Sequence, residues 1–269
     1  MPFTISHAAA ILPFSRFLAR WRLLSATLIG SMVPDFGLFS PWRWRPARFE
    51  THSLDGLITF CLPVGLATYW LFQRLIKTPL LQVLPPGAYA RWRETGAPAD
   101  YRSLRQWILA ACGILAGAFT HLVWDGFTHE GGRGLRMLPA LEEPAVQISG
   151  HRLGGTYLLQ DANSLIGLIV VFAVVAYSLR PGKEIEASTP RRLQARERYL
   201  WVTAYVLAAA ALSGLFLLMK YRPPPGVTGL TAPISSAAIA TLRGLGFALV
   251  GTSVCLTLRL RKSSPGPPA

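Results

Sequence analysis

Four long runs without any charged residue restrict what this chain can fold into more than any other feature. They cover residues 56–73, 106–124, 162–179 and 199–219 and are 18 to 21 residues long. In a fifth apolar stretch, from 223 to 258, Arg243 is the one charged residue. About 20 apolar residues in an α-helix cross the hydrocarbon core of a bilayer. We therefore expect an all-α fold, a polytopic helical membrane protein with about five transmembrane helices, near residues 55–76, 106–128, 159–179, 199–219 and 236–258.

Composition favours membrane spans over the alternative, which is a set of buried core helices in a soluble bundle. Hydrophobic residues make up 51% of the 269 residues and charged residues only 15%, whereas soluble domains carry about 25% charged residues. The same hydrophobic fraction excludes an intrinsically disordered chain. With three cysteines, the chain is not a disulfide-stabilised scaffold either.

The excess of positive charge has two readings. Lys and Arg number 27 and Asp and Glu 13, a formal net charge of +14, which a nucleic-acid-binding protein could carry. The basic residues lie in loops beside the apolar runs, however, as the positive-inside rule describes. We therefore expect membrane lipids, and no nucleic acid, as partners. The loops at 77–105 and 180–198 and the C-terminus hold 14 basic residues against 11 on the other side, which favours an extracytoplasmic N-terminal segment.

The chain divides into four predicted parts. Residues 1–180 form a helical membrane domain with a metal site, 181–198 a basic linker, 199–260 a C-terminal pair of transmembrane helices, and 261–269 a disordered tail. Within the first part we expect an amphipathic helix near residues 5–17. The apolar stretch at 23–39 is short for a span and better suits a re-entrant or half-buried helix. No cleaved signal peptide is expected, because the first four residues carry no basic side chain.

One pattern in the second span points to chemistry, namely His121, Asp125 and His129 at intervals of four. Residues four apart share a helix face, and ionisable groups in a membrane span are costly and commonly functional. His121 and His129 are about 12 Å apart along a straight helix, too far to bind one ion together. Three arrangements would reconcile the pattern with metal binding. Two ions could lie about 3.5–4 Å apart with Asp125 between them, the helix could end near Gly126, or His129 could lie outside the ligand set. The alternative is a buried hydrogen-bonded pair of His121 and Asp125.

Three further polar residues, His7, Asp35 and His52, precede the first span. Singly, a histidine is more often a satisfied polar residue, and an Asp after Pro is usually a turn or helix cap. The first two spans nevertheless form a hairpin, so the end of the second span lies on the same side of the membrane as the start of the first. Neutral imidazoles with carboxylates form the ligand sets of zinc, manganese and iron sites in hydrolases. Together these three residues would supply two imidazoles and a carboxylate on the side of the membrane where the second span ends with His121, Asp125 and His129.

Gln160 and Ser164 open the third span on the same side of the membrane and share a helix face. We expect them to bind substrate or to orient a ligand, with helix capping and interhelical hydrogen bonding as the equal alternative. Arg243, alone in the last span, is expected to snorkel or to pair inside the protein.

Four motifs resemble a family of uncharacterised bacterial integral membrane proteins that is defined as a domain of unknown function. They are Met-Pro-Phe-Thr-Ile-Ser-His at 1–7, Gly-Ser-Met-Val-Pro-Asp-Phe at 30–36, Thr-His-Ser at 51–53 and His-Leu-Val-Trp-Asp-Gly-Phe-Thr-His at 121–129. The resemblance covers roughly residues 1–180. It extends to membrane-bound metal-dependent hydrolases and, remotely, to zinc-dependent phospholipase C. By that resemblance the metal ligands would be, in order, His7, Asp35, His52, His121, Asp125 and His129. It implies location in the bacterial cytoplasmic (inner) membrane.

The phospholipases have a later His-x3-Glu pair for a further zinc ion. Here Gln160-x3-Ser164 stands nearest to it, so a full three-metal site is not expected. The combined hypothesis is a membrane-embedded hydrolase with one or two divalent ions, zinc first, and a phosphoester or lipid headgroup as substrate. Asp125 or Asp35 would bridge the metals or act as the catalytic base. The alternative is a non-enzymatic membrane protein whose cluster is structural, or binds an ion as in a transporter. An open coordination position would distinguish a catalytic from a structural site.

Overall fold

The chain folds as two compact units. Unit 1 comprises Met1–Gly37, Trp44–Tyr69 and Asp100–Tyr177, and unit 2 comprises Leu38–Arg43, Trp70–Ala99 and Ser178–Ala269. The computed structural model describes residues 4–39, 48–92, 103–129, 132–141, 144–148, 151–180, 193–219 and 231–262. Most of the predicted linker at 181–198 and all but two residues of the predicted tail at 261–269 lie outside the described residues.

Within the described residues, five helices are long and apolar enough to cross a membrane, which confirms the all-α class and indicates a multi-pass membrane protein. These helices expose many large apolar side chains, such as Leu207 of α11, which is 65% exposed. Such a surface is unfavourable in water and suits a lipid environment. The five candidate spans are Leu54–Val83, Leu104–Thr128, Leu158–Ser178, Ala195–Leu218 and Ser236–Leu260.

Unit 1 is built around α9, to which the N-terminal region adds short helices. The predicted amphipathic helix at 5–17 is instead two 3-10 segments, Thr4–Ala10 and Leu12–Phe14, followed by α1. A small antiparallel hairpin of β1 and β2 precedes α10. The elements are α1 (Ser15–Arg20), α2 (Leu24–Gly30), a 3-10 turn (Val33–Asp35), α3 (Phe36–Phe39), α4 (Arg48–Thr51), α9 (Leu104–Thr128), a 3-10 turn (Pro139–Leu141), β1 (Pro144–Ile148), β2 (His151–Gly154) and α10 (Gly155–Ser178).

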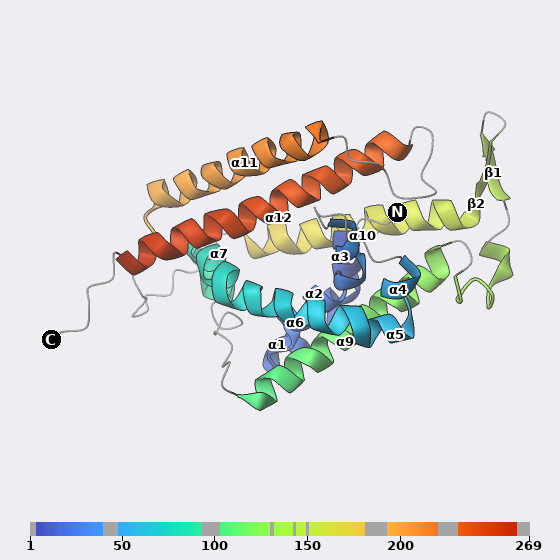
Figure 1. Cartoon of the computed structure of the whole chain (residues 1–269), viewed down its shortest axis with the longest axis horizontal. Coiled ribbons are helices and arrows are strands. Elements are labelled where there is room, and N and C mark those ends of the chain that lie inside the picture. Colours follow the sequence, from blue (N-terminus) through green and yellow to red (C-terminus); the bar gives the residue numbers. More distant parts are fainter. Residues whose placement is uncertain are drawn as a thin grey trace. The chain divides into compact units, whose positions relative to one another are not determined.

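Close packing of α2 on α9 forms the core of unit 1 (Figure 1). The two backbones touch at glycines. A Cβ on Gly30 would lie 2.2 Å from the carbonyl oxygen of Ile114, and one on Gly117 would lie 2.1 Å from that of Thr27. With only seven residues, α2 is too short to span a bilayer, as expected for the 23–39 stretch. It is followed by a 3-10 turn that contains Pro34, a residue that cannot donate an intrahelical hydrogen bond.

The first span is one continuous helix that contains two wider π-helical turns. It runs through α5 (Leu54–Gly56), a π-turn, α6 (Leu62–Leu71), a second π-turn and α7 (Lys77–Val83). The first π-turn, Leu57–Cys61, ends two residues before Pro63, whose ring would clash with the preceding turn of a regular helix. The predicted loop at 77–105 begins inside this helix and also contains α8 (Pro86–Trp92).

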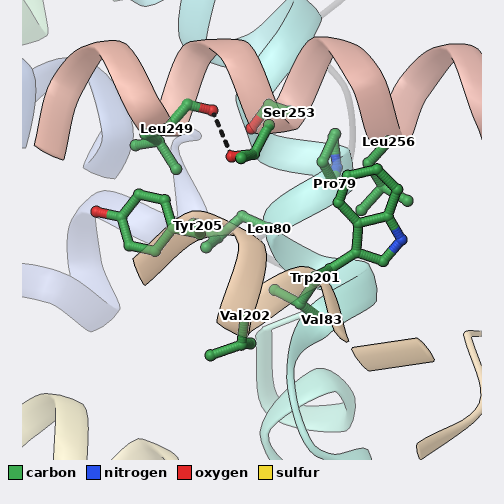
Figure 2. A pocket seen from close by; sticks show the side chains of 10 residues that line it. Pro79, Leu80, Val83, Trp201, Val202, Tyr205, Leu249, Ser253 and Leu256 are labelled. Carbon is green, nitrogen blue, oxygen red and sulfur yellow. Dashed lines mark hydrogen bonds between the residues drawn. The ribbon is translucent and has the colours of Figure 1, made fainter. Parts of the chain in front are cut away.

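Unit 2 contains α11 (Ala195–Leu218) and α12 (Thr231–Lys262) side by side (Figure 1). Two contacts show that they are antiparallel: Arg259 pairs with Glu197 at 2.6 Å, and the Ser213 hydroxyl donates to the carbonyl of Thr241. A cavity of about 250 Å³ lies among α7, α11 and α12, with Trp201 and Tyr205 in its mostly apolar wall (Figure 2). That lining offers no cluster of ionisable side chains, so we place the candidate site in unit 1.

Arg243 pairs inside unit 2, and we expect Arg243→Met to lower the free energy of unfolding by about 2–3 kcal/mol. Its Nε and Nη2 donate to the carbonyls of Phe39 and Leu38 at 3.2 and 3.1 Å, and the residue is buried. Arg259→Met on the same helix is the control, because its side chain is 54% exposed and such ion pairs contribute about 0–1 kcal/mol. Thermal unfolding in detergent would measure both, and equal effects would contradict the assignment.

Candidate metal centre

The six predicted ligands come together in unit 1, although they are spread over more than 120 residues of sequence. All are buried except His52 and His129, whose side chains are 10% and 21% exposed. Short segments outside α9 carry three of the ligands, and α9 with its C-cap carries the other three. His7 lies in the 3-10 segment Thr4–Ala10, Asp35 ends the turn after α2, His52 follows α4, His121 and Asp125 lie in α9, and His129 is its C-cap.

Asp125 is the centre of the cluster, and each of its oxygens faces two imidazoles. Its Oδ2 lies 3.4 Å from His121 Nε2 and 3.5 Å from His52 Nε2. Its Oδ1 lies 3.4 Å from His129 Nδ1 and 3.6 Å from His7 Nε2. The carboxylate therefore separates the four histidines into two pairs.

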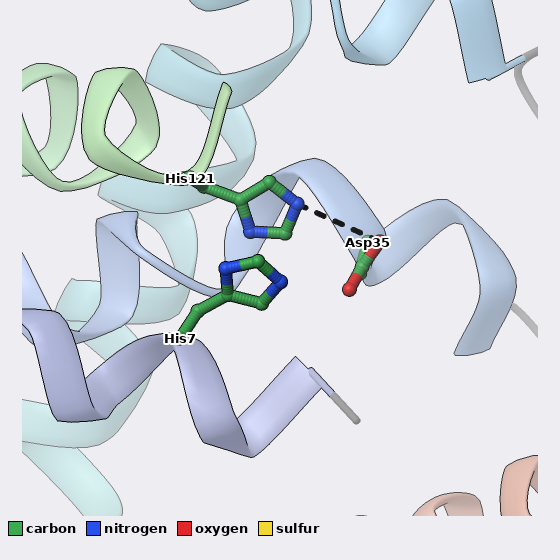
Figure 3. Close-up of side chains that lie close together, drawn as sticks. All are labelled: His7, Asp35 and His121. Atoms are coloured by element: carbon green, nitrogen blue, oxygen red, sulfur yellow. Dashed lines mark ion pairs between the residues drawn. The ribbon is translucent and has the colours of Figure 1, made fainter. Parts of the chain in front are cut away.

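Asp35 faces the first of these pairs. Its Oδ1 lies 3.4 Å from His52 Nε2 and 3.8 Å from His121 Nε2, and the latter pair is drawn with His7 in Figure 3. The other oxygen, Oδ2, accepts a hydrogen bond of 2.8 Å from the Thr4 hydroxyl. Thr4 thus orients the carboxylate so that Oδ1 points into the cluster.

The separations in the cluster are longer than hydrogen bonds. Hydrogen bonds from N–H to oxygen measure about 2.7–3.2 Å, whereas the six His–carboxylate distances run from 3.4 to 3.8 Å. The Nε2 atoms of His7, His52 and His121 are buried and make no hydrogen bond to the described part of the chain. Zinc–ligand bonds of about 2.0–2.2 Å give a tetrahedron edge of roughly 3.3–3.6 Å. The donor atoms are therefore spaced as neighbouring ligands of one ion.

The backbone of Ser31 determines which nitrogen of His121 is free to bind a metal. His121 Nδ1 lies 2.8 Å from the carbonyl oxygen of Ser31, and because a carbonyl only accepts, Nδ1 must carry the proton. In a neutral ring Nε2 then keeps its lone pair. This outer contact is the type that orients metal-binding histidines.

His7 is held in the neutral form. Burial lowers its pKa from 6.5 to about 4, and repulsion from His121 acts in the same direction, while Asp125 and Asp35 partly offset both. The two rings are stacked, with centroids 3.7 Å apart and planes inclined by 20° (Figure 3). Neutral imidazole is the form that binds a metal ion.

Asp35 is held in the charged form. Burial acts to raise its pKa, but the polar contact with His52 and the positive potential of His121 and His52 outweigh it and bring the pKa down from 3.8 to about 2. The carboxylate is therefore ionised and able to bind a cation at neutral pH.

Two groups of three residues could hold a metal ion: His7, Asp35 and His121, and His52, His121 and Asp125. His129 belongs to neither group, although it contacts Asp125. The reason is that α9 ends at Thr128 and His129 adopts an extended backbone with ψ of 139°. Of the arrangements left open by the sequence, its geometry fits an outer position or a second ion on Asp125 Oδ1.

Gln160 and Ser164 are both buried in α10. The Ser164 hydroxyl donates to the carbonyl of Gln160 at 2.7 Å, a hydrogen bond within the helix like those of the predicted alternative. One turn further, a Cβ on Gly167 would lie 2.7 Å from the Cβ of Ser6, so α10 passes directly beside the segment that carries His7. A substrate contact of Gln160 or Ser164 stays a prediction.

Sequence reasoning missed three polar residues that support the cluster. Thr4 holds Asp35, the Ser31 carbonyl holds His121, and the Thr51 hydroxyl lies 2.7 Å from His52 Nδ1. All three belong to motifs that also contain a ligand, and this proximity was the available signal. Their contacts could not be read from it, because Thr4 and Ser31 act on residues 31 and 90 positions away.

Comparison with known proteins finds one family. The family model described as "Domain of unknown function (DUF4184)" matches residues 1–254, which is most of the chain. No curated protein and no solved structure matches the chain.

Proposed function

This chain belongs to the family described as a domain of unknown function (DUF4184), and from the geometry of its His–Asp cluster we propose that it is a membrane-embedded, metal-dependent hydrolase. The single observation that carries the proposal is the spacing of the buried donor atoms. Five of the six His–carboxylate distances, at 3.4–3.6 Å, match the edge of a zinc coordination tetrahedron, and all six exceed hydrogen-bond lengths.

The residues suggest where one or two ions would bind. His52, His121 and Asp125 Oδ2 would supply three donors for one ion and leave a fourth position for water or substrate. The other group that could hold an ion is His7, Asp35 and His121, while His129 faces Asp125 Oδ1. Imidazole and carboxylate together favour zinc, with manganese and iron as chemically related occupants.

Access to the cluster favours an enzyme over a purely structural metal site. His52, Asp125 and His129 line a cavity of about 530 Å³, whereas structural zinc sites are closed by four protein ligands. A bound divalent metal lowers the pKa of a coordinated water to about 7. Asp35 and Asp125 would help to hold the ion, and they are the carboxylates of the cluster that could serve as the base.

A phosphoester is the substrate class that we favour. The cluster lies at one end of the α9 span, the depth at which a membrane protein meets lipid headgroups. The distribution of basic residues favours the extracytoplasmic side of a bacterial inner membrane.

Metal analysis of protein purified in detergent tests the proposal. We expect about one or two zinc ions per chain, together with hydrolysis of the soluble phosphodiester bis-(p-nitrophenyl) phosphate. Chelation should remove both, and added Zn²⁺ should restore both. Folded protein without stoichiometric metal would contradict the proposal. Stoichiometric metal without any phosphoester hydrolysis would instead favour the alternative, a membrane protein that binds the ion structurally or transports it.

A further inference from the structure

The cavity beside the cluster has two chemically different halves. Its polar half contains His52, Asp125 and His129, and its other half is formed by apolar side chains, including Phe119, Leu122 and Val123 of α9. The cavity measures about 530 Å³, which is within the range for a small-molecule site. Both halves belong to unit 1.

The apolar half runs along α9 away from the cluster. Phe119, Leu122 and Val123 are spaced by three and four residues and share one helix face. Phe119 lies about 9 Å from Asp125 along the axis, toward the middle of the span. Phe119 and Val123 are 50% and 46% exposed, so in a membrane this wall is open to the acyl-chain region. A fully water-soluble substrate would gain no binding energy from such an apolar wall.

Arg133 supplies a positive charge to the lining of the cavity. Of the described residues that line the cavity, Arg133 is the one with a permanent positive charge. Its loop folds back onto the end of α9, because Leu135 is fully buried and its N–H donates to the carbonyl of Gly126 at 3.2 Å. The Arg133 side chain is itself exposed. A guanidinium there can bind the oxygens of a phosphate group in bidentate fashion.

We infer that the substrate is an amphiphile, whose phosphoester group is bound between the His–Asp cluster and Arg133 while its apolar chain lies against Phe119, Leu122 and Val123. This inference rests on the proposed function and adds to it the class of substrate, its orientation and the residues that select it. The charged groups lie at the end of the span and the apolar wall extends toward the membrane interior. This arrangement suits a lipid that enters the site laterally from the bilayer.

Two phosphodiesters of different polarity test the inference, namely phosphatidylglycerol in mixed micelles and soluble bis-(p-nitrophenyl) phosphate. We expect kcat/KM for the lipid to exceed that for the soluble ester. Val123→Trp would fill the apolar half and should lower the lipid-to-soluble ratio of kcat/KM by about tenfold or more. Phe172→Ala on α10, at an exposed apolar position that does not line the cavity, should leave the ratio unchanged.

Arg133→Gln should lower kcat/KM for the lipid by roughly 10- to 100-fold, since it removes a charged hydrogen-bond donor. Arg136→Gln is the matched control, because Arg136 is exposed in the same loop but does not line the cavity. A Val123→Trp ratio equal to that of wild type, or equal effects of the two arginine variants, would overturn the inference. If the inference fails in this way while the wild-type protein binds metal and hydrolyses the soluble ester, the proposed function still holds. If the wild-type protein has neither metal nor activity on the soluble ester, the proposed function is wrong as well.

Discussion

Asp125→Asn is expected to remove bound metal and to lower phosphoester hydrolysis by more than about a hundredfold, the upper range seen when only an outer partner of a metal ligand is lost. Asp125 is the residue on which both halves of the cluster depend, because its two oxygens face four imidazoles at 3.4–3.6 Å. Asparagine keeps the size of the side chain. It removes the negative charge, however, and replaces one oxygen by an NH2 group that cannot accept or ligate.

Asp161→Asn is the control for this substitution, since Asp161 is an exposed acid near the start of α10. It should leave metal content and activity at the wild-type level. Elemental analysis and the initial rate with bis-(p-nitrophenyl) phosphate measure the two effects, and thermal unfolding shows whether the variant is folded. A folded Asp125→Asn protein that keeps its full metal content would rule out Asp125 as a ligand.

Gly117→Ala is expected to destabilise the protein by about 1–3 kcal/mol, the range for overpacking a tight core, and to weaken metal binding. The added methyl group would lie 2.1 Å from the Thr27 carbonyl oxygen and 2.7 Å from the Ser31 nitrogen. Both are backbone atoms, so relief requires α2 to move away from α9. That movement would displace the Ser31 carbonyl, which holds His121 Nδ1 at 2.8 Å.

Gly246→Ala in α12 provides the matched control. It places the same methyl group in a transmembrane helix, where no other atom lies within 4 Å of the new Cβ. There alanine should be neutral or stabilising by a few tenths to about 1 kcal/mol, because glycine is unfavourable inside a helix. The apparent melting temperature and the zinc content after dialysis are the measurements. Equal melting temperatures for the two variants would mean that α2 and α9 tolerate separation.

Local patterns in the sequence were sufficient to predict where the spans lie. Each predicted span overlaps a helix of sufficient length, because the bilayer imposes the same requirement of about 20 apolar residues on every crossing. The boundaries were less accurate. The first helix continues to Val83, past Arg74 and Lys77. Lys77 is buried there and donates to Gln73 at 2.9 Å. Gln73 lies four residues before Lys77 on the same helix face, but a search for uncharged runs stops at the first charged residue and so could not extend the span past Arg74.

The same reasoning applies to the cluster. The placement of His121 and Asp125 on one face of α9 was predictable, because it depends only on 3.6 residues per turn. Their approach to His7, Asp35 and His52 depended on the hairpin between two spans, and the distances confirm that these side chains meet. His129 could not be placed in advance, since the end of α9 at Thr128 decides its direction.

The sequence by itself therefore determined the number of spans, the helical class and the residue types available for metal chemistry, because these follow from composition and helical periodicity along a single segment. Only the tertiary structure decided which carboxylate oxygen faces which imidazole, that Thr4 and Ser31 orient Asp35 and His121, and that Arg133 stands beside an apolar wall of α9. These features arise where glycines let α2 and α9 approach closely and where loops fold back. Contacts between segments tens of residues apart leave no periodic signal in either segment.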